Sequence, residues 1–170
     1  LPMKHWTAQS CLINFGDGVR QHWYGPDSHL RGLAGIDHHR HAQGMADAAL
    51  RLGYDGGGFL NLVYPNADLA GAGPEDLPTF HHFTDKDIVF MRSDWSGDES
   101  LLGFICGPPL GHRALRFYTN EVGGGHMNPN AGSFQLFAYG QRLISGDGYF
   151  YKRTEYQNTV LVDGVGQFGD

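Results

Sequence analysis

The spacing of hydrophobic residues changes partway along the chain. From about Ile36 to Leu52, apolar side chains recur on one broad face at helical spacing, and Gly53 follows as a stop signal. After about residue 78 the spacing becomes two, in short segments separated by Gly, Pro, Asn or Asp, which is typical of antiparallel strands. The six strand candidates are DIVFMRSDW, SLLGFICG, ALRFYTN, SFQLFAYG, QRLISG and NTVLVDG.

The clearest strand candidate is SFQLFAYG, where Phe134, Leu136 and Ala138 alternate with the residues between them. Between the helical and the alternating halves lies YPNADLAGAGPEDLP, rich in Pro, Gly and Asp and without periodicity, which predicts a linker. Helices followed by a run of antiparallel strands indicate an α+β chain, with a helical region attached to an antiparallel β-sandwich.

Composition narrows the class of protein. A chain of 170 residues with 41% hydrophobic residues can bury a core. Its 26 glycines argue against a helical bundle, and its 12 Lys and Arg residues argue against a nucleic-acid binder. With a net charge of -6, an acidic substrate requires a local basic patch. The sequence contains no apolar run of about 18 residues, so no membrane partner is expected. The abrupt first residues and the end after a strand and turn predict a piece of a longer protein.

Two histidine-rich stretches are candidate metal sites. DHHRH, Asp37 to His41, offers ligand spacing for a metal-dependent hydrolase, but HExxH is absent and the stretch opens the predicted helix with Asp37 as a suitable N-cap. His81 and His82 lie just before a predicted strand and face opposite sides of it, so they are not expected to bind one ion together. The helical interpretation of DHHRH is favoured, and metal analysis distinguishes the hydrolase alternative.

A richer constellation begins at GGGHMNPNAGSF, Gly123 to Phe134, where three glycines lead into one histidine beside a strand. A hairpin would place this loop near the segment SGDGYFYKR, so that an imidazole, phenols and cations meet. The alternative is the polar end of a sandwich, and spacing alone leaves both open. The candidate residues are His126, Asn128, Asn130, Asp147, Tyr149, Tyr151, Lys152, Arg153, Tyr156, Gln157 and Asn158.

The run GGGHMNPNAGSFQLFAYGQRLISGDGYFYKRTEYQNTVLVDGVGQ, Gly123 to Gln167, resembles the signature of the heparinase II/III-like polysaccharide lyases. That signature is approximately GHxHxDxNSFxLYAxGxxLxxDxGY followed by HNTxLVDGxGQ. Within the family, the HMNP variant is most similar to the exolytic oligoalginate lyases. The resemblance implies the end of an (α/α) toroid in residues 1–64, a linker in 65–77, and the first part of the family's β-sandwich in 78–170.

The resemblance also implies an activity: β-elimination at a uronate of an acidic polysaccharide or oligosaccharide, alginate-type favoured, without a cofactor. His126 would be the catalytic donor or proton-transfer residue, and the toroid's own histidine and tyrosine would lie upstream of Leu1. The implied substrate-binding residues are Tyr149, Tyr151, Lys152, Arg153 and Asn128. The implied source is bacterial, with a cytoplasmic or alternatively a periplasmic location.

Departures from the signature concern a zinc site that some family members hold with two histidines and an aspartate. Asp147 keeps the aspartate position, but Asn128 and Gln157 replace the histidines. Amides are poor zinc ligands beside imidazole, so no metal is expected here. Two further alternatives stay open: a non-catalytic carbohydrate-binding β-sandwich, and a heparin- or heparan-type lyase of the same family.

Overall fold

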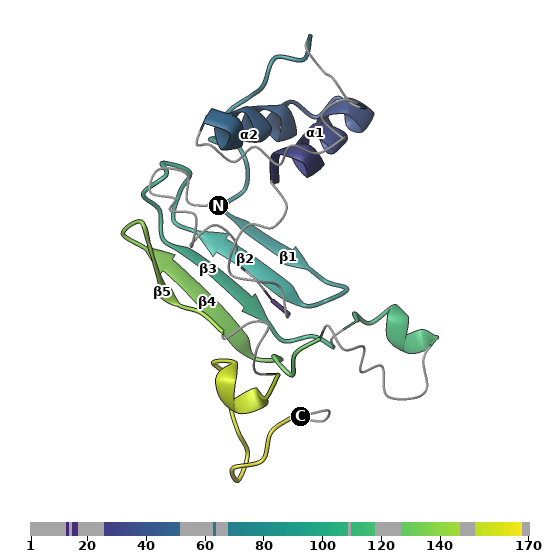
Figure 1. Cartoon of the computed structure of the whole chain (residues 1–170), viewed down its shortest axis with the longest axis vertical. Helices are drawn as coiled ribbons and strands as arrows, with labels where there is room; N and C mark the ends of the chain where they lie inside the picture. The colour runs from purple at the N-terminus through teal and green to yellow at the C-terminus, as the bar shows by residue number, and fades with distance from the viewer. Residues whose placement is uncertain are drawn as a thin grey trace. The chain divides into compact units, whose positions relative to one another are not determined.

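The computed structural model describes residues 13, 15–16, 26–51, 63, 68–108, 110–117, 127–146 and 152–167. The chain divides into two compact units: His22–Leu77 forms one, and Leu1–Gln21 together with Pro78–Asp170 forms the other. The described part of the first unit contains the helices α1 and α2, and the described part of the second contains an antiparallel sheet (Figure 1). The described residues are therefore of mixed α+β class.

The clearest helix predicted from the sequence ran from about Ile36 to Leu52, and the described residues of this stretch belong to two helices. Helix α1 spans Pro26–Asp37 and helix α2 spans Arg40–Arg51. The chain breaks at His38, which has a left-handed φ of 50°. The N-cap is His39 and not Asp37, because the Nδ1 of His39 accepts a hydrogen bond from the Ala42 N–H at 3.2 Å. The predicted helix therefore corresponds to α2, except that Ile36 and Asp37 belong to the end of α1, most of which was not predicted.

The segment predicted as a linker lies along α2 wherever it is described. The Ala72 N–H donates to the Arg40 carbonyl at 2.9 Å, and a Cβ added to Gly71 would lie 2.7 Å from the Gly44 Cα. Two glycines facing each other let the two backbones approach this closely. Residues 68–77 therefore pack as part of the helical unit.

The sheet contains five strands in the order β1-β2-β3-β4-β5, each antiparallel to the next. The strands are β1 (Phe80–Phe83), β2 (Ile88–Arg92), β3 (Leu101–Ile105), β4 (Ser133–Ala138) and β5 (Gln141–Ile144). The strand predictions over β2 to β5 are confirmed. Strand β1 was missed because the sequence FHHF has no polar alternation to reveal it.

Two strand predictions were wrong in their described parts. Ala114–Arg116, within ALRFYTN, forms a 3₁₀ turn. Within NTVLVDG, Val162 forms an isolated bridge with Val165, around Asp163 and Gly164, whose φ angles are 53° and 75°. An Asp-Gly pair in the left-handed region makes a tight two-residue turn, which is too short to extend a strand. The second layer of the predicted sandwich does not appear among the described residues.

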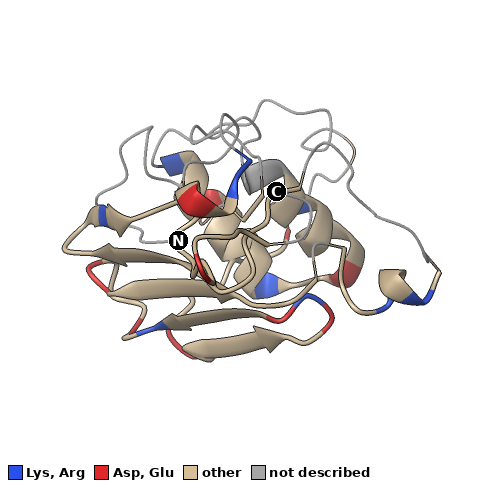
Figure 2. Cartoon of the chain, turned by 90° about the horizontal axis from the view of Figure 1, so that it is seen from below, with Lys and Arg blue, Asp and Glu red and all other residues tan. Residues whose placement is uncertain are grey.

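The buried face of the sheet is formed by alternate residues of β3 and β4. Leu101, Gly103 and Ile105 face Phe137, Gln135 and Ser133 across the two strands. Gly103 is required here, because a Cβ would lie 2.7 Å from the Ile13 Cγ2. The Phe15 ring lies 6.3 Å from the Phe90 ring, so Ile13 and Phe15 pack on this face. Among the described residues, no helix is long and apolar enough to cross a membrane. Charged residues occur mainly in the connections and at strand ends (Figure 2).

Candidate functional site

The loop that leads into β4 is a tight, buried turn. The Asn130 N–H donates to the Asn128 carbonyl at 2.9 Å, and the Ser133 N–H donates to the Asn130 carbonyl at 2.9 Å. The Gly132 N–H donates to the Ile105 carbonyl at 2.7 Å, which joins the turn to the end of β3. The sequence Asn-Pro-Asn favours such a turn, because Asn and Pro stabilise turn conformations locally. The MNPNAG part of the matched run is thereby fixed against the sheet.

Asn128, predicted to bind substrate, is only 3% exposed. Its Nδ2 donates to the Gly16 carbonyl at 2.9 Å. This contact ties the β4 loop to the segment that covers the sheet. A direct contact of Asn128 with a substrate stays a prediction, and its described contact is with the protein's own main chain.

The C-terminal segment closes on the same loop through an arrangement named here the Ala131 clasp, formed by Ala131, Thr154, Thr159 and Gln167. The Gln167 Nε2 and the Thr159 Oγ1 each donate to the Ala131 carbonyl at 2.6 Å, and the Ala131 N–H donates to the Gln167 Oε1 at 3.1 Å. The Gln167 N–H donates to the Oγ1 of Thr154, which is 1% exposed. Thr154, Thr159 and Gln167 were not predicted as site residues, although Gln167 ends the matched run.

The two predicted cations differ in accessibility. Lys152 is half-buried, whereas the Arg153 side chain is 70% exposed with its Nη1 3.5 Å from the Glu155 Oε1. An exposed ion pair of this kind contributes little and is easily exchanged for another anion. Arg153 therefore presents a guanidinium at the surface, next to one carboxylate.

Four of the predicted site residues lie outside the described part of the chain: His126, Asp147, Tyr149 and Tyr151. Gln157, at one of the zinc positions, is 3% exposed. Its Oε1 lies against Gly146, where an added Cβ would approach it to 3.1 Å. Within the described residues, no group of three or more His, Cys, Asp or Glu side chains is placed to hold a metal ion.

The described histidines of DHHRH make structural contacts. His39 caps α2. The Nδ1 of His41 lies 2.7 Å from the Gly73 carbonyl and therefore carries the hydrogen, because a carbonyl oxygen only accepts. Its Nε2 lies 3.6 Å from the Asp76 carboxylate. These contacts position the 68–77 segment on α2.

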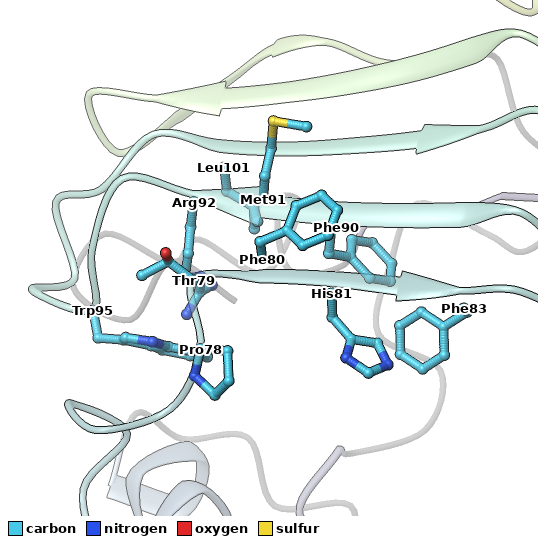
Figure 3. Close-up of a pocket in the computed structure, with 10 residues that line it drawn as sticks. All are labelled: Pro78, Thr79, Phe80, His81, Phe83, Phe90, Met91, Arg92, Trp95 and Leu101. Carbon is cyan, nitrogen blue, oxygen red and sulfur yellow. The ribbon is translucent and has the colours of Figure 1, made fainter.

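A pocket that was not predicted from the sequence lies on the sheet at strands β1 to β3. It is a pocket of about 220 Å³ with several aromatic rings (Figure 3). The His81 and Phe83 rings lie 4.4 Å apart, and the Arg92 guanidinium lies 3.6 Å from the centre of the Trp95 ring. The lining residues are Pro78, Thr79, Phe80, His81, Phe83, Phe90, Met91, Arg92, Trp95 and Leu101.

Beside this pocket, Arg92 forms an ion pair with Glu99, whose Oε1 lies 3.3 Å from the Arg92 Nη2. The two side chains are 5% and 0% exposed. Burial lowers the pKa of the Arg92 guanidinium, while the negative charges of Glu99 and Asp94 act in the opposite direction. The sequence held no signal for this pair, because the arginine lies in a strand and the glutamate lies in a loop seven positions later.

A cluster of Asp87, His82 and His112 joins two histidines that are 30 positions apart in the sequence. The Asp87 Oδ2 lies 2.6 Å from the His112 Nε2, and its Oδ1 lies 3.0 Å from the His82 Nε2. Hydrogen bonds from His112 and then His82 lower the pKa of the Asp87 carboxyl. Because an ionised carboxylate only accepts, both imidazoles carry a hydrogen on Nε2. The cluster links the β1–β2 turn to residues 110–117, where the His112 N–H also donates to the Asp85 carbonyl.

No protein-family model and no curated protein sequence matches the chain. Among solved structures, it is similar to the heparan sulfate lyase HepC from Pedobacter heparinus, with 15% identity and a TM-score of 0.48, over 86% of this chain and 18% of that one. A mutant of the same lyase gives 18% identity and a TM-score of 0.40, over 91% and 23% of the two chains. The chain thus spans about a fifth of the length of these structures.

Proposed function

We propose that this chain is part of a polysaccharide lyase that cleaves a uronate-containing acidic polysaccharide or oligosaccharide by β-elimination. The observation that carries the proposal is the matched run from Gly123 to Gln167. Its two halves, the β4 loop and the TEYQNTVLVDGVGQ segment, are bonded to each other at Ala131. These hydrogen bonds explain why the two halves of the run occur together in one sequence: the second half holds the loop of the first half in place.

The reaction places definite demands on a site. The C5 proton of a uronate becomes removable when donors neutralise the neighbouring carboxylate. A base then takes the proton, an acid protonates the departing 4-oxygen, and an unsaturated uronate remains. Preorganised donors at the developing negative charge supply the electrostatic part of such catalysis, and a tuned imidazole or phenol supplies the proton transfer.

The chain's residues are assigned roles on this basis. His126 donates to the substrate carboxylate or relays the proton, and Tyr149 and Tyr151 contact the sugar. Lys152 and Arg153 supply the local positive charge that a chain of net charge -6 otherwise lacks. Asn128 serves the same site, and the bond from its Nδ2 to the Gly16 carbonyl favours an indirect role through the loop. The toroid histidine and tyrosine complete the acid–base set in the proposed full enzyme, in a bacterial cytoplasm or periplasm.

An alginate-type substrate is favoured, because the HMNP variant is most similar to oligoalginate lyases. A heparin- or heparan-type substrate is the alternative within the same reaction. A non-catalytic carbohydrate-binding module is the second candidate function. The aromatic pocket beside Trp95 favours it, because ligand pockets combine apolar and aromatic walls with a few polar groups.

The test is to incubate the full-length protein with mannuronate, guluronate, heparan sulfate and chondroitin polymers, and to follow the ultraviolet absorbance of the unsaturated product. A neutral glucan is the matched control, because it has no carboxylate to support elimination. Absorbance that rises with one uronate polymer is the expected result. Binding of a uronate polymer without any rise in absorbance would replace the lyase with the carbohydrate-binding module.

A further inference from the structure

A short turn in the connection between β3 and β4 carries two arginines on one side. Ala114–Arg116 forms a 3₁₀ turn, and the Arg116 N–H donates to the Arg113 carbonyl at 3.2 Å, which closes a repeat of three residues. Side chains three positions apart in a 3₁₀ turn lie one above the other, separated by about 6 Å along its axis. Arg113 and Arg116 therefore project from the same side of the turn, and both are exposed.

The two arginines have no acidic partner of their own. In the part of the chain that the structure describes, no carboxylate lies within ion-pair distance of either guanidinium. Two like charges side by side repel each other, so the arrangement does not stabilise the turn itself. An oxyanion would remove this repulsion, because each planar guanidinium can hold a carboxylate or a tetrahedral anion such as sulfate through two parallel hydrogen bonds.

The turn is fixed to the β1–β2 connection by its first residues. The His112 N–H donates to the Asp85 carbonyl at 2.7 Å, and the Arg113 N–H donates to the Asp85 Oδ1 at 2.9 Å. The His112 Nε2 lies 2.6 Å from the Asp87 Oδ2. Gly111, with φ of 92°, permits this approach, because a Cβ there would lie 2.6 Å from the Asp85 Oδ2. The arginine pair is thus held in place before a ligand binds, which lowers the entropic cost of binding.

The charge around the turn is positive although the whole chain is acidic. Asp85 and Asp87 are negative, but their oxygens accept hydrogen bonds from the main chain and from the two imidazoles. Lys86, between them in the sequence, is exposed. Together with Arg113 and Arg116 it leaves a positive balance, in a chain of net charge -6. An acidic ligand is therefore favoured here over a neutral one.

An aromatic ring lies next to the arginines in the chain. Phe117 directly follows Arg116 and is 81% exposed, although exposure of a large apolar side chain to water is unfavourable. The negative face of an aromatic ring attracts the polarised C–H groups on one side of a sugar ring. Cations beside an exposed ring thus suit an acidic saccharide, which combines anionic groups with apolar C–H faces.

We propose that Arg113, Arg116 and Phe117 bind one acidic unit of a polysaccharide, with the guanidiniums on its carboxylate or sulfate and the ring against its C–H face. The choice of a saccharide rests on the proposed function, whereas anion binding by the arginine pair does not. These residues lie outside the matched run, and they add to Lys152 and Arg153, the cations predicted from the sequence.

The experiment measures the binding of labelled oligosaccharides to the full-length protein by fluorescence anisotropy, at low and at high salt. The probes are an oligoalginate, which carries only carboxylates, a heparan sulfate oligomer and a neutral glucan of equal length. The variants are Arg113→Gln and Arg116→Gln, singly and together, and Phe117→Ala. Arg51→Gln is the matched control, because it removes the same charge from an exposed arginine at the end of α2.

Each arginine substitution should weaken the binding of an acidic oligomer by about two- to fivefold at low salt and by less at high salt. Phe117→Ala should weaken the same binding by about two- to tenfold at both salt concentrations, because it removes an apolar contact. Arg51→Gln should bind as the wild type does. A loss with oligoalginate identifies the carboxylate as a bound group, and a loss confined to heparan sulfate identifies the sulfate.

The outcomes separate this site from the proposed activity. If the wild type makes no unsaturated product but the arginine variants lose saccharide binding, the lyase proposal falls and the site stands. If the wild type makes the product and the arginine variants bind as Arg51→Gln does, the site is wrong and the lyase proposal stands. A single-stranded DNA oligomer that binds the wild type as tightly as the acidic saccharides would also overturn the site, because the arginines would then recognise charge alone.

Discussion

Amide and hydroxyl side chains in the β4 loop and the C-terminal segment bond mainly to main-chain groups. Asn128 reaches Gly16, while Thr159 and Gln167 reach Ala131. A buried peptide group without a partner costs free energy, so loops that leave a sheet need such side chains to satisfy their N–H and C=O groups. At the scale of single residues, the amides of the matched run thus stabilise the loop that the proposed chemistry uses.

His126→Ala is expected to lower turnover of the full-length enzyme by about a hundred- to a thousandfold, because one lost transition-state donor typically costs that much. Turnover and thermal stability should be measured side by side on the same preparation. Near-normal turnover, or a loss that follows the fraction unfolded, would remove His126 from the mechanism.

Asp87→Asn is expected to lower the thermal midpoint at pH 6, because the mutation removes the carboxylate between His82 and His112. The folded pKa of Asp87 lies below its ordinary 3.8, so its contribution is fully present above that pH and is lost as pH falls through the folded pKa. The difference between wild type and variant should therefore shrink below pH 3.8. Asp163→Asn, in an exposed turn, is the control, and an equal midpoint shift in both variants would contradict a specific role for Asp87.

Elements of the sheet unit are joined by their connections as well as by strand pairing. Arg92 at the end of β2 pairs with Glu99 in the connection to β3, and its guanidinium also stacks on Trp95. A buried charge is tolerated only with a close partner of opposite sign, so this ion pair constrains the path of residues 93–100. The aromatic wall of the pocket is consequently held by an electrostatic contact.

Glu99→Gln should destabilise the full-length protein by about 3–5 kcal/mol, because it leaves the buried Arg92 without its carboxylate. Glu155→Gln breaks a comparable pair with the exposed Arg153 and should cost only about 0–1 kcal/mol. Urea unfolding of both variants provides the comparison. Similar losses in both would show that burial of the Arg92 pair is energetically unimportant.

Gly44→Ala tests the packing of α2 on residues 71–73. Alanine in place of glycine in an exposed helix stabilises by about 1 kcal/mol. At Gly44, however, a Cβ would lie 2.0 Å from the Ala72 carbonyl oxygen, so the segment must move. We expect a net destabilisation of about 1–3 kcal/mol in urea unfolding. A gain in stability would mean that the segment does not lie against α2.

At the scale of the whole molecule, the helices and the sheet form separate compact units, and residues 1–21 belong with the sheet. The proposed assignment of residues 1–64 to the end of a toroid concerns the longer protein and stays a prediction. The matched run lies wholly in the sheet unit. We therefore propose that this unit provides one wall of the active site.

The full-length protein is expected to contain no stoichiometric zinc after a chelator wash, because Asn128 and Gln157 occupy the positions of two imidazole ligands. Elemental analysis, with turnover measured before and after the wash, checks this. Zinc that is retained at one per chain and lost on Asp147→Asn would contradict the prediction. Zinc that is lost only on substitution of His39 and His41 would favour the DHHRH alternative.

The sequence by itself determined the α+β class and four of the five strands, because period-two alternation bounded by Gly, Pro, Asn and Asp is a local signal. It also located the matched run and therefore the proposed chemistry. It did not predict most of α1 or the break between α1 and α2, because that break depends on the φ of His38 and on a cap from an unusual residue.

Only the tertiary structure decided which polar residues are buried and what they contact. Ser133 and Gln135 alternate as solvent-facing residues would, yet they lie on the buried face, because Ile13 and Phe15 pack there against Gly103. The Ala131 clasp, the Arg92–Glu99 pair and the Asp87 cluster each join residues at least five positions apart through hydrogen bonds or charge. Such contacts depend on how strands and loops meet in space, and the spacing of residues along a chain carries no record of that.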